Sequence, residues 1–153
     1  MFRRKPLTDD EKRQRIEDLY AKSKTHFPEV SEVTVDELDG LRRSEDVILV
    51  DVRGPEERAV STIPGAVTSE EVNSDPDAYE GKTLVAYCTV GHRSGLFAKD
   101  LQAKGMRVFN LKGAILAWTH SGSDLELDGE PTRRVHVAGP QWSLEASGYE
   151  PVW

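Results

Sequence analysis

The sequence holds one cysteine in 153 residues, few aromatic residues (7 %) and no long apolar run. A single cysteine excludes an internal disulfide framework and fits a reducing compartment. No stretch approaches the ~18 consecutive apolar residues that a transmembrane helix needs. Residues 1–12 carry basic side chains but lack the apolar stretch of a secretory signal. We therefore expect a soluble, cytoplasmic protein.

An excess of positive charge is also missing. Lys and Arg number 20 against 27 Asp and Glu, which gives a net charge of −7. This balance argues against general binding to nucleic acid or to anionic membranes, because both need a basic surface. The four histidines, His26, His92, His120 and His136, are too scattered for a local metal motif. We expect no metal site.

Apolar runs alternate with helical patterns along the middle of the chain. The runs at 47–51 (VILVD) and 84–88 (LVAYC) are continuous, as in strands buried on both faces. Together with a strand at 106–111 and helices at 94–105 and 113–122, they predict an α/β domain with a mainly parallel central sheet flanked by helices. Shorter elements are also expected: a strand within 30–35, a helix capped by Asp36, a helical turn at 54–60, an extended piece at 63–67 and a helix or turn at 75–83.

The two ends of the chain differ in composition and pattern from its middle part. Thr8 and Glu11 fit a capping box for a charge-rich helix, with Ile16, Leu19 and Tyr20 on its apolar face. The last thirty residues or so are rich in Gly and Pro, and they end with Trp142, Tyr149 and Trp153. Such a segment either covers an apolar surface of the domain or binds a partner. We divide the chain into a flanking helix (1–29), a central domain (30–122) and a C-terminal extension (123–153).

The only cysteine, Cys88, lies at the end of a predicted strand, where open α/β sheets bind their ligands. Gly91 allows a tight turn, and consecutive N–H groups in such a turn, with the helix that follows, attract an anion. Arg93 and a protonated His92 add positive charge. These conditions lower the pKa of a cysteine and favour the nucleophilic thiolate over a packed structural thiol.

Three motifs resemble the rhodanese-like family of sulfurtransferases, in order and with fitting spacing. CTVGHRS at 88–94 is similar to the family's active-site loop, DVRGPEERAVSTIPGA at 51–66 to its upstream signature, and LKGAILAW at 111–118 to its closing signature. The match spans about residues 30–122 in a single copy. Ser61 and Thr62 depart from the Gly-His pair that is common before Ile-Pro-Gly-Ala, and Arg58 replaces a frequent aromatic residue.

The resemblance implies a rhodanese-like, single-domain sulfurtransferase without metal or organic cofactor. Cys88 accepts a sulfur from thiosulfate or a persulfide and passes it to a thiophilic acceptor, a thiol or a protein. Donor-binding residues are implied to be Thr89, Val90, Gly91, His92 and Arg93. Asp51 and Arg53 either brace the site or form a purely structural pair. The Glu56–Glu57 and Glu70–Glu71 pairs are expected to face solvent, although Glu57 falls within the upstream signature.

Two other functions stay open. A cysteine phosphatase or arsenate reductase of the same fold has five residues between Cys and Arg, whereas four lie between Cys88 and Arg93 here. The shorter ring of amides fits a single sulfur better than a tetrahedral oxyanion. A non-catalytic interaction module or a sulfur-relay partner is the other alternative, although such a module would tolerate loss of Cys88 or Arg93, and both are present.

Overall fold

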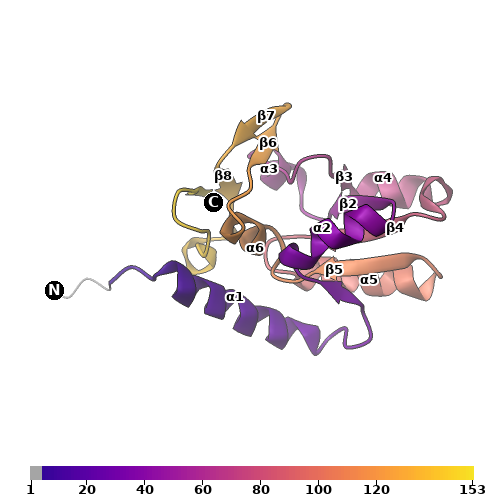
Figure 1. The fold of residues 1–153 in the computed structure, drawn as a ribbon, viewed down its shortest axis with the longest axis horizontal. Helices are drawn as coiled ribbons and strands as arrows, with labels where there is room; N and C mark the ends of the chain where they lie inside the picture. The colour runs from indigo at the N-terminus through magenta and orange to yellow at the C-terminus, as the bar shows by residue number, and fades with distance from the viewer. Residues whose placement is uncertain (1–4) are drawn as a thin grey trace.

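A single parallel sheet forms the centre of the molecule (Figure 1), in a computed structural model that describes residues 5–153. The first four residues of the predicted flanking segment lie outside this range. The strand order is β1-β5-β4-β2-β3, and all four pairings are parallel. The predicted α/β fold with a flanked parallel sheet is confirmed. The strands of this sheet are β1 (Glu32–Val33), β2 (Val47–Asp51), β3 (Val67–Thr68), β4 (Thr83–Tyr87) and β5 (Arg107–Leu111).

The two apolar runs become the central strands, as predicted. Every residue of β4 is buried, and β2 is buried over its last three residues. The register pairs Asp51 with Tyr87, so β2 and β4 end at the same edge of the sheet. Cys88 follows β4 immediately and therefore lies at this edge, beyond the carboxyl ends of the strands.

Helices cover the sheet on both faces, and the cap of α2 and the presence of α4 differ from the prediction. Helix α2 is capped by Thr34, whose hydroxyl accepts from the Glu37 amide, and not by Asp36. Helix α4 was not expected, and its capping box joins Thr68 to Glu71. The helices are α1 (Asp9–Lys24), α2 (Val35–Ser44), α3 (Pro55–Arg58), α4 (Ser69–Ser74), α5 (His92–Ala103) and α6 (Ala114–His120), with 3-10 turns η1 (Pro76–Tyr79) and η2 (Pro140–Trp142).

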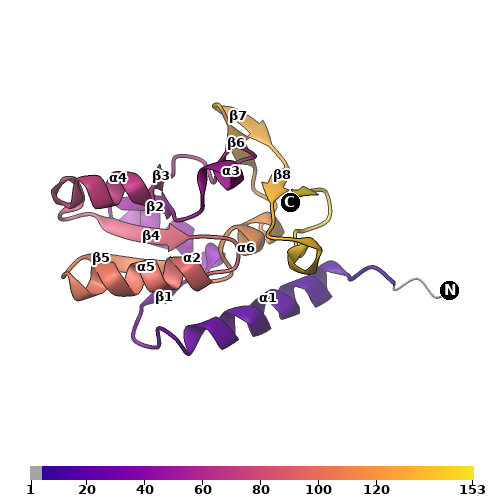
Figure 2. The ribbon, with the colours of Figure 1, turned by 180° about the vertical axis from the view of Figure 1, so that it is seen from behind.

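Helix α1 begins at the predicted capping box, in which the Thr8 hydroxyl accepts from the Glu11 amide at 3.2 Å. It lies along one side of the molecule (Figure 2) and packs against α5 and α6. Ile16 and Tyr20 are buried there, and Leu19 is half-buried. The predicted apolar face is therefore the face that docks on the domain.

The segment after residue 122 folds back over the domain. It forms an antiparallel hairpin of β6 (Leu125–Leu127) and β7 (Glu130–Thr132), and a parallel pair of β8 (Arg134–His136) and β9 (Glu150–Val152). The unusual Ser61 and Thr62 hold it: the Ser61 hydroxyl donates to the Arg134 carbonyl (2.6 Å), and Thr62 exchanges two backbone hydrogen bonds with Glu126. This segment adds buried side chains to the core: Leu125, Val135, Val137, Leu144, Ala146 and Tyr149.

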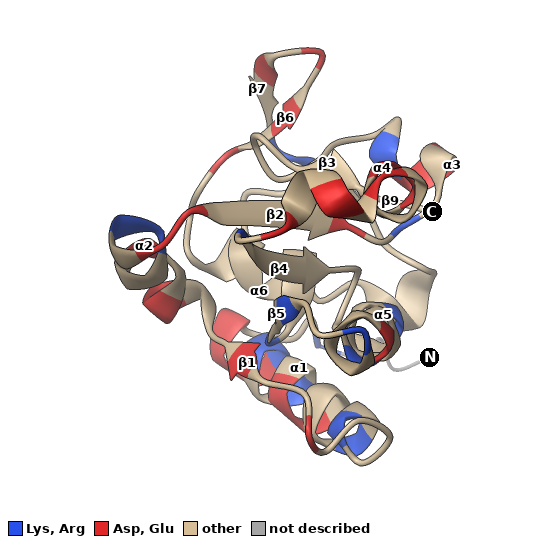
Figure 3. Ribbon diagram, turned by 90° about the vertical axis from the view of Figure 1, so that its right-hand side faces the viewer, with Lys and Arg blue, Asp and Glu red and all other residues tan. Residues whose placement is uncertain are grey.

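Charged residues of both signs are interspersed over the outer helices (Figure 3). Along residues 5–153, no helix combines the length and the apolar character that crossing a bilayer requires. The same residues contain no group of three or more His, Cys, Asp or Glu side chains placed to hold a metal ion.

Candidate functional site

Cys88 opens a short turn between β4 and α5. Helix α5 begins at His92, two residues earlier than predicted, so His92 and Arg93 belong to its first turn. Gly91 precedes the helix with φ +131°, a conformation that side chains rarely adopt. Of the predicted loop, residues 89–91 form a turn, and His92 and Arg93 belong to helix α5. The amino-terminal end of α5, the positive end of its dipole, points toward Cys88.

The Cys88 side chain is nearly enclosed, with a relative exposure of 2 %. Its Sγ lies 3.4 Å from the Ser94 hydroxyl, which donates to Asn110 Oδ1 at 2.7 Å. Asn110 Nδ2 donates in turn to the Gly91 carbonyl at 2.9 Å, and this fixes the orientation of the amide because a carbonyl can only accept. Asn110 therefore ties the last residue of the turn and the first turn of α5 to β5. Sequence analysis missed Ser94 and Asn110, whose roles depend on contacts across the fold.

The carbonyl groups and the amide groups of the turn differ in their hydrogen bonding. The Cys88 and Thr89 carbonyls accept from the amides of Ile115 and Leu116 at the start of α6, both at 3.2 Å. In contrast, the amides of Thr89 to Gly91 find no acceptor within residues 5–153. Neighbouring N–H groups without acceptors form a concave site for an anion.

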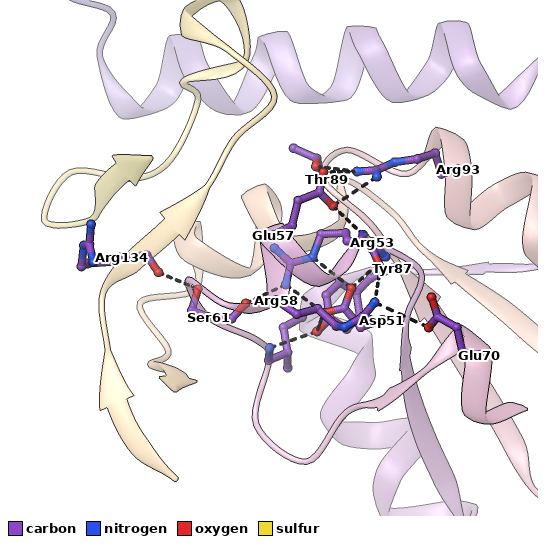
Figure 4. Close-up of polar contacts among 12 residues, drawn as sticks. Asp51, Arg53, Glu57, Arg58, Ser61, Glu70, Tyr87, Thr89, Arg93 and Arg134 are labelled. Carbon is purple, nitrogen blue, oxygen red and sulfur yellow. Dashed lines mark hydrogen bonds and ion pairs between the residues drawn. The ribbon is translucent and has the colours of Figure 1, made fainter. Parts of the chain in front are cut away.

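Arg93 is held by a carboxylate that sequence analysis placed in solvent. Its two terminal nitrogens donate to the two oxygens of Glu57, both at 3.1 Å, and one of them also donates to the Thr89 hydroxyl (3.1 Å; Figure 4). Glu57 is buried, contrary to the expectation, because it also accepts from the Gly54 amide and caps α3. The position of Glu57 within the upstream signature was the feature of the sequence that could have indicated its place in the site.

The electrostatic surroundings keep Arg93 charged. Partial burial acts to lower the pKa of its guanidinium, but the hydrogen bonds to Glu57 and the negative charges of Cys88 and Glu57 raise that pKa overall. The side chain is 44 % exposed. Arg93 therefore presents a fixed positive charge at the rim of the site, partly balanced by Glu57.

Asp51 and Arg53 form a second ion pair below the site. Arg53 donates to both oxygens of Asp51 (3.0 and 2.8 Å) and to the Ser61 carbonyl (2.7 Å). The Tyr87 hydroxyl donates to Asp51 Oδ2 at 2.8 Å and accepts from the Ile63 amide (Figure 4). No hydrogen bond joins this pair to residues 88–93 in the part of the chain that the structure describes. The pair adjoins the site through Tyr87, the neighbour of Cys88.

Helix α1 packs directly on glycines around the turn. A Cβ atom at Gly91 would lie 2.8 Å from the Tyr20 ring, and one at Gly113 would lie 2.9 Å from Ile16. A Cβ atom at Gly95 would overlap the Phe27 ring just after α1. The helix can approach this closely only because these three positions lack side chains.

One pocket of about 510 Å³ gathers most of the predicted site residues. Cys88, Thr89, Val90, His92 and Arg93 line it, whereas Gly91, Asp51 and Arg53 do not belong to its lining. The His92 ring lies 5.4 Å from the His26 ring, measured between centroids. The pocket therefore brings together one sulfur, an arginine held by a carboxylate, and backbone amides that have no acceptor within residues 5–153.

A family model and two known proteins match this chain in sequence. The family model for the rhodanese-like domain matches residues 34–121. A protein from Allochromatium vinosum named sulfurtransferase is 37 % identical over 92 residues, which cover 54 % of this chain and 80 % of that protein. An uncharacterized Synechocystis protein is 37 % identical over 89 residues, 56 % of this chain and 50 % of its own length.

The solved structures give the same fold. A rhodanese-like domain protein from Staphylococcus aureus is 29 % identical with a TM-score of 0.56, and the match covers 65 % of this chain and all of that one. The chain thus spans half of the Synechocystis relative and most of the Allochromatium one. The family match covers more than half of the chain and includes the Cys88 turn, Glu57, Arg93 and the buried Asp51–Arg53 pair. The chain belongs to the rhodanese-like domain family.

Proposed function

We propose that this protein is a sulfurtransferase that carries sulfur as a persulfide on Cys88. The observation that supports this most is the position of Cys88 at the floor of a pocket, beside backbone amides that have no acceptor in the described part of the chain. These amides favour a negatively charged sulfur over a neutral thiol. The Allochromatium relative, named sulfurtransferase, favours the same chemistry.

The reaction consists of two displacements. The Cys88 thiolate attacks the outer sulfur of thiosulfate or a persulfide, and the bond from that sulfur to the rest of the donor breaks. Sulfite or a thiolate leaves with the electron pair, and the persulfide anion remains on Cys88 within reach of the free amides of the turn. An acceptor thiol or cyanide then attacks the outer sulfur of the persulfide and regenerates the Cys88 thiolate.

The other residues of the pocket bind rather than transfer protons. Arg93 attracts and orients the anionic end of the donor, and Glu57 and Thr89 hold its guanidinium in place. His92 lies exposed at the rim of the pocket. Asp51 and Arg53 brace the end of β4 through Tyr87, so that Cys88 stays at the floor of the pocket.

Intact mass after incubation with thiosulfate tests this function. We expect a gain of about 32 Da, one covalent sulfur, which cyanide removes with release of thiocyanate. Cys88 is the only cysteine, so a Cys88→Ser variant should show no gain, and any adduct in the wild type belongs to that residue. Absence of the adduct with thiosulfate and with an organic persulfide would overturn the proposal. Hydrolysis of p-nitrophenyl phosphate would then point to the phosphatase alternative.

A further inference from the structure

Half of the wall around Cys88 comes from segments outside the matched family domain. Helix α1 and the residues after it form one side, and the C-terminal extension forms another. The residues from these two segments are Leu19, Lys22, Ser23, His26, Ala138 and Trp142. A domain limited to residues 34–121 would leave the Cys88 turn open on both sides.

The pocket is larger and more apolar than an inorganic donor needs. At about 510 Å³ it lies within the range of about 300–1,000 Å³ that is typical of pockets for organic ligands. Leu19, Val90 and Trp142 line it from three different elements. Thiosulfate has no apolar group to bury against them, whereas an organic substituent on the donor would remove that surface from water.

The charges around the pocket favour an anion. Glu57, the only acidic residue of the lining, is buried beside Arg93, whereas Arg93 and Lys22 are exposed, so the accessible charges of the pocket are positive. The Lys22 side chain is exposed and forms no salt bridge within residues 5–153. An apolar wall with a cationic rim fits a small organic anion.

We propose that Leu19 and Trp142 determine the sulfur donor, and that the donor is an organic anion, R–S–S⁻, with an apolar group R. This inference rests on the proposed function. The Cys88 thiolate attacks the terminal sulfur, an S–S bond to Cys88 forms, the S–S bond inside the donor breaks, and RS⁻ leaves with the electron pair. The total charge of −2 is unchanged, and no oxidant or reductant is needed. Leu19 and Trp142 contact the group R and hold the terminal sulfur over Cys88.

Two stable sulfur donors with the same reacting group can test whether Leu19 and Trp142 determine the donor. Benzenethiosulfonate and methanethiosulfonate both deliver sulfur and release a sulfinate, and they differ in the size of the apolar group. Sulfur transfer to cyanide, followed as thiocyanate, gives kcat/KM for each. We expect the wild type to prefer benzenethiosulfonate by about tenfold, because the ring is removed from water between Leu19 and Trp142.

Substitutions in the wall should reduce this preference. We expect Trp142→Ala and Leu19→Ala each to lower the ratio of the two kcat/KM values at least threefold, and Trp142→Phe to lower it less. The difference in intrinsic reactivity between the donors cancels when variants are compared. Trp153→Ala and Leu96→Ala are matched controls, because these side chains lie outside the pocket and are 62 % and 44 % exposed. They should leave the ratio as in the wild type.

The outcomes separate this inference from the proposed function. If thiosulfate, an organic persulfide and both thiosulfonates leave Cys88 without added sulfur, the proposed function fails, and the donor inference fails with it. If sulfur transfer is normal but the wild type shows no preference, or Leu19→Ala and Trp142→Ala retain it, only the donor inference is overturned. Thermal unfolding shows whether each variant is folded. If either Leu19→Ala or Trp142→Ala does not fold, the ratio measured for the other variant tests the inference.

Discussion

Two arginine–carboxylate pairs lie near Cys88, and they differ mainly in burial. Asp51 and Arg53 are 1 % and 0 % exposed, and the closest N–O distance is 2.8 Å. Glu57 and Arg93 are 9 % and 44 % exposed, at 3.1 Å. The first pair is locked by the Tyr87 hydroxyl and the Ser61 carbonyl, whereas the second faces the pocket.

This difference in burial determines whether such a pair can only support the fold or can also bind a substrate. A fully buried pair cannot exchange its partner for a substrate, because a lone charge in the core is strongly unfavourable. A pair at the rim of a pocket keeps part of its positive charge available to an incoming anion at little cost in free energy. Under the proposed function, the same chemical pairing has a structural role in the buried pair Asp51–Arg53 and a binding role in the exposed pair Glu57–Arg93.

The largest expected effect is on the buried pair. Asp51→Asn leaves the Arg53 charge without its partner in the core, so we expect a loss of about 3–5 kcal/mol in the free energy of unfolding. Urea unfolding followed by circular dichroism measures it. The double variant Asp51→Leu with Arg53→Met should lose less than the single variant, since it leaves no unpaired charge. A loss below about 1 kcal/mol for Asp51→Asn would contradict the structural role.

A smaller effect is expected from removing the hydroxyl group that holds this pair. Tyr87→Phe leaves the buried Ile63 amide without its acceptor and Asp51 with one donor fewer. We expect a loss of about 1–3 kcal/mol in the free energy of unfolding. Since Tyr87 braces Cys88 without touching the donor, KM for thiosulfate should change less than about twofold. A large rise in KM at a temperature where the variant is folded would assign this network to binding.

The smallest effect on stability is expected at the rim. Glu57→Gln keeps the shape of the side chain but removes the charge that balances Arg93, and we expect a loss of at most about 1 kcal/mol. Under the proposed function, the more positive pocket should lower KM for thiosulfate about threefold, and added salt should diminish this gain. Steady-state kinetics at two ionic strengths measures both. An unchanged or higher KM at low salt would mean that Glu57 acts mainly by orienting Arg93.

The sequence predicted the central strands closely and the rest of the sheet only roughly. The runs 47–50 and 84–88 are apolar throughout, which is sufficient to identify buried strands. The edge strands β1 and β3 contain only two residues each: β1 lies within the strand predicted at 30–35, whereas β3 overlaps the extended piece predicted at 63–67 only at Val67. Helix α4 was missed although Thr68 and Glu71 have the spacing of a capping box.

The candidate site was predicted where its residues are adjacent in sequence. Cys88, Gly91 and Arg93 stand within one turn, and local chemistry suffices to connect them. Glu57 was placed in solvent because it follows another glutamate, and only the fold brings it to Arg93, 36 residues away. Asn110 and Trp142 come from segments still farther along the chain. Contacts of this kind depend on the packing of whole elements and leave no local pattern.

The close packing of α1 on glycines makes the helix and the Cys88 turn a matched pair. Tyr20 can occupy its place only while Gly91 has no side chain, and Phe27 depends in the same way on Gly95. A turn transplanted from this chain into another rhodanese-like domain would lose the surface that covers it. Conversely, a relative with a side chain at the position of Gly91 would have to carry its flanking helix elsewhere, and its pocket would have a different wall.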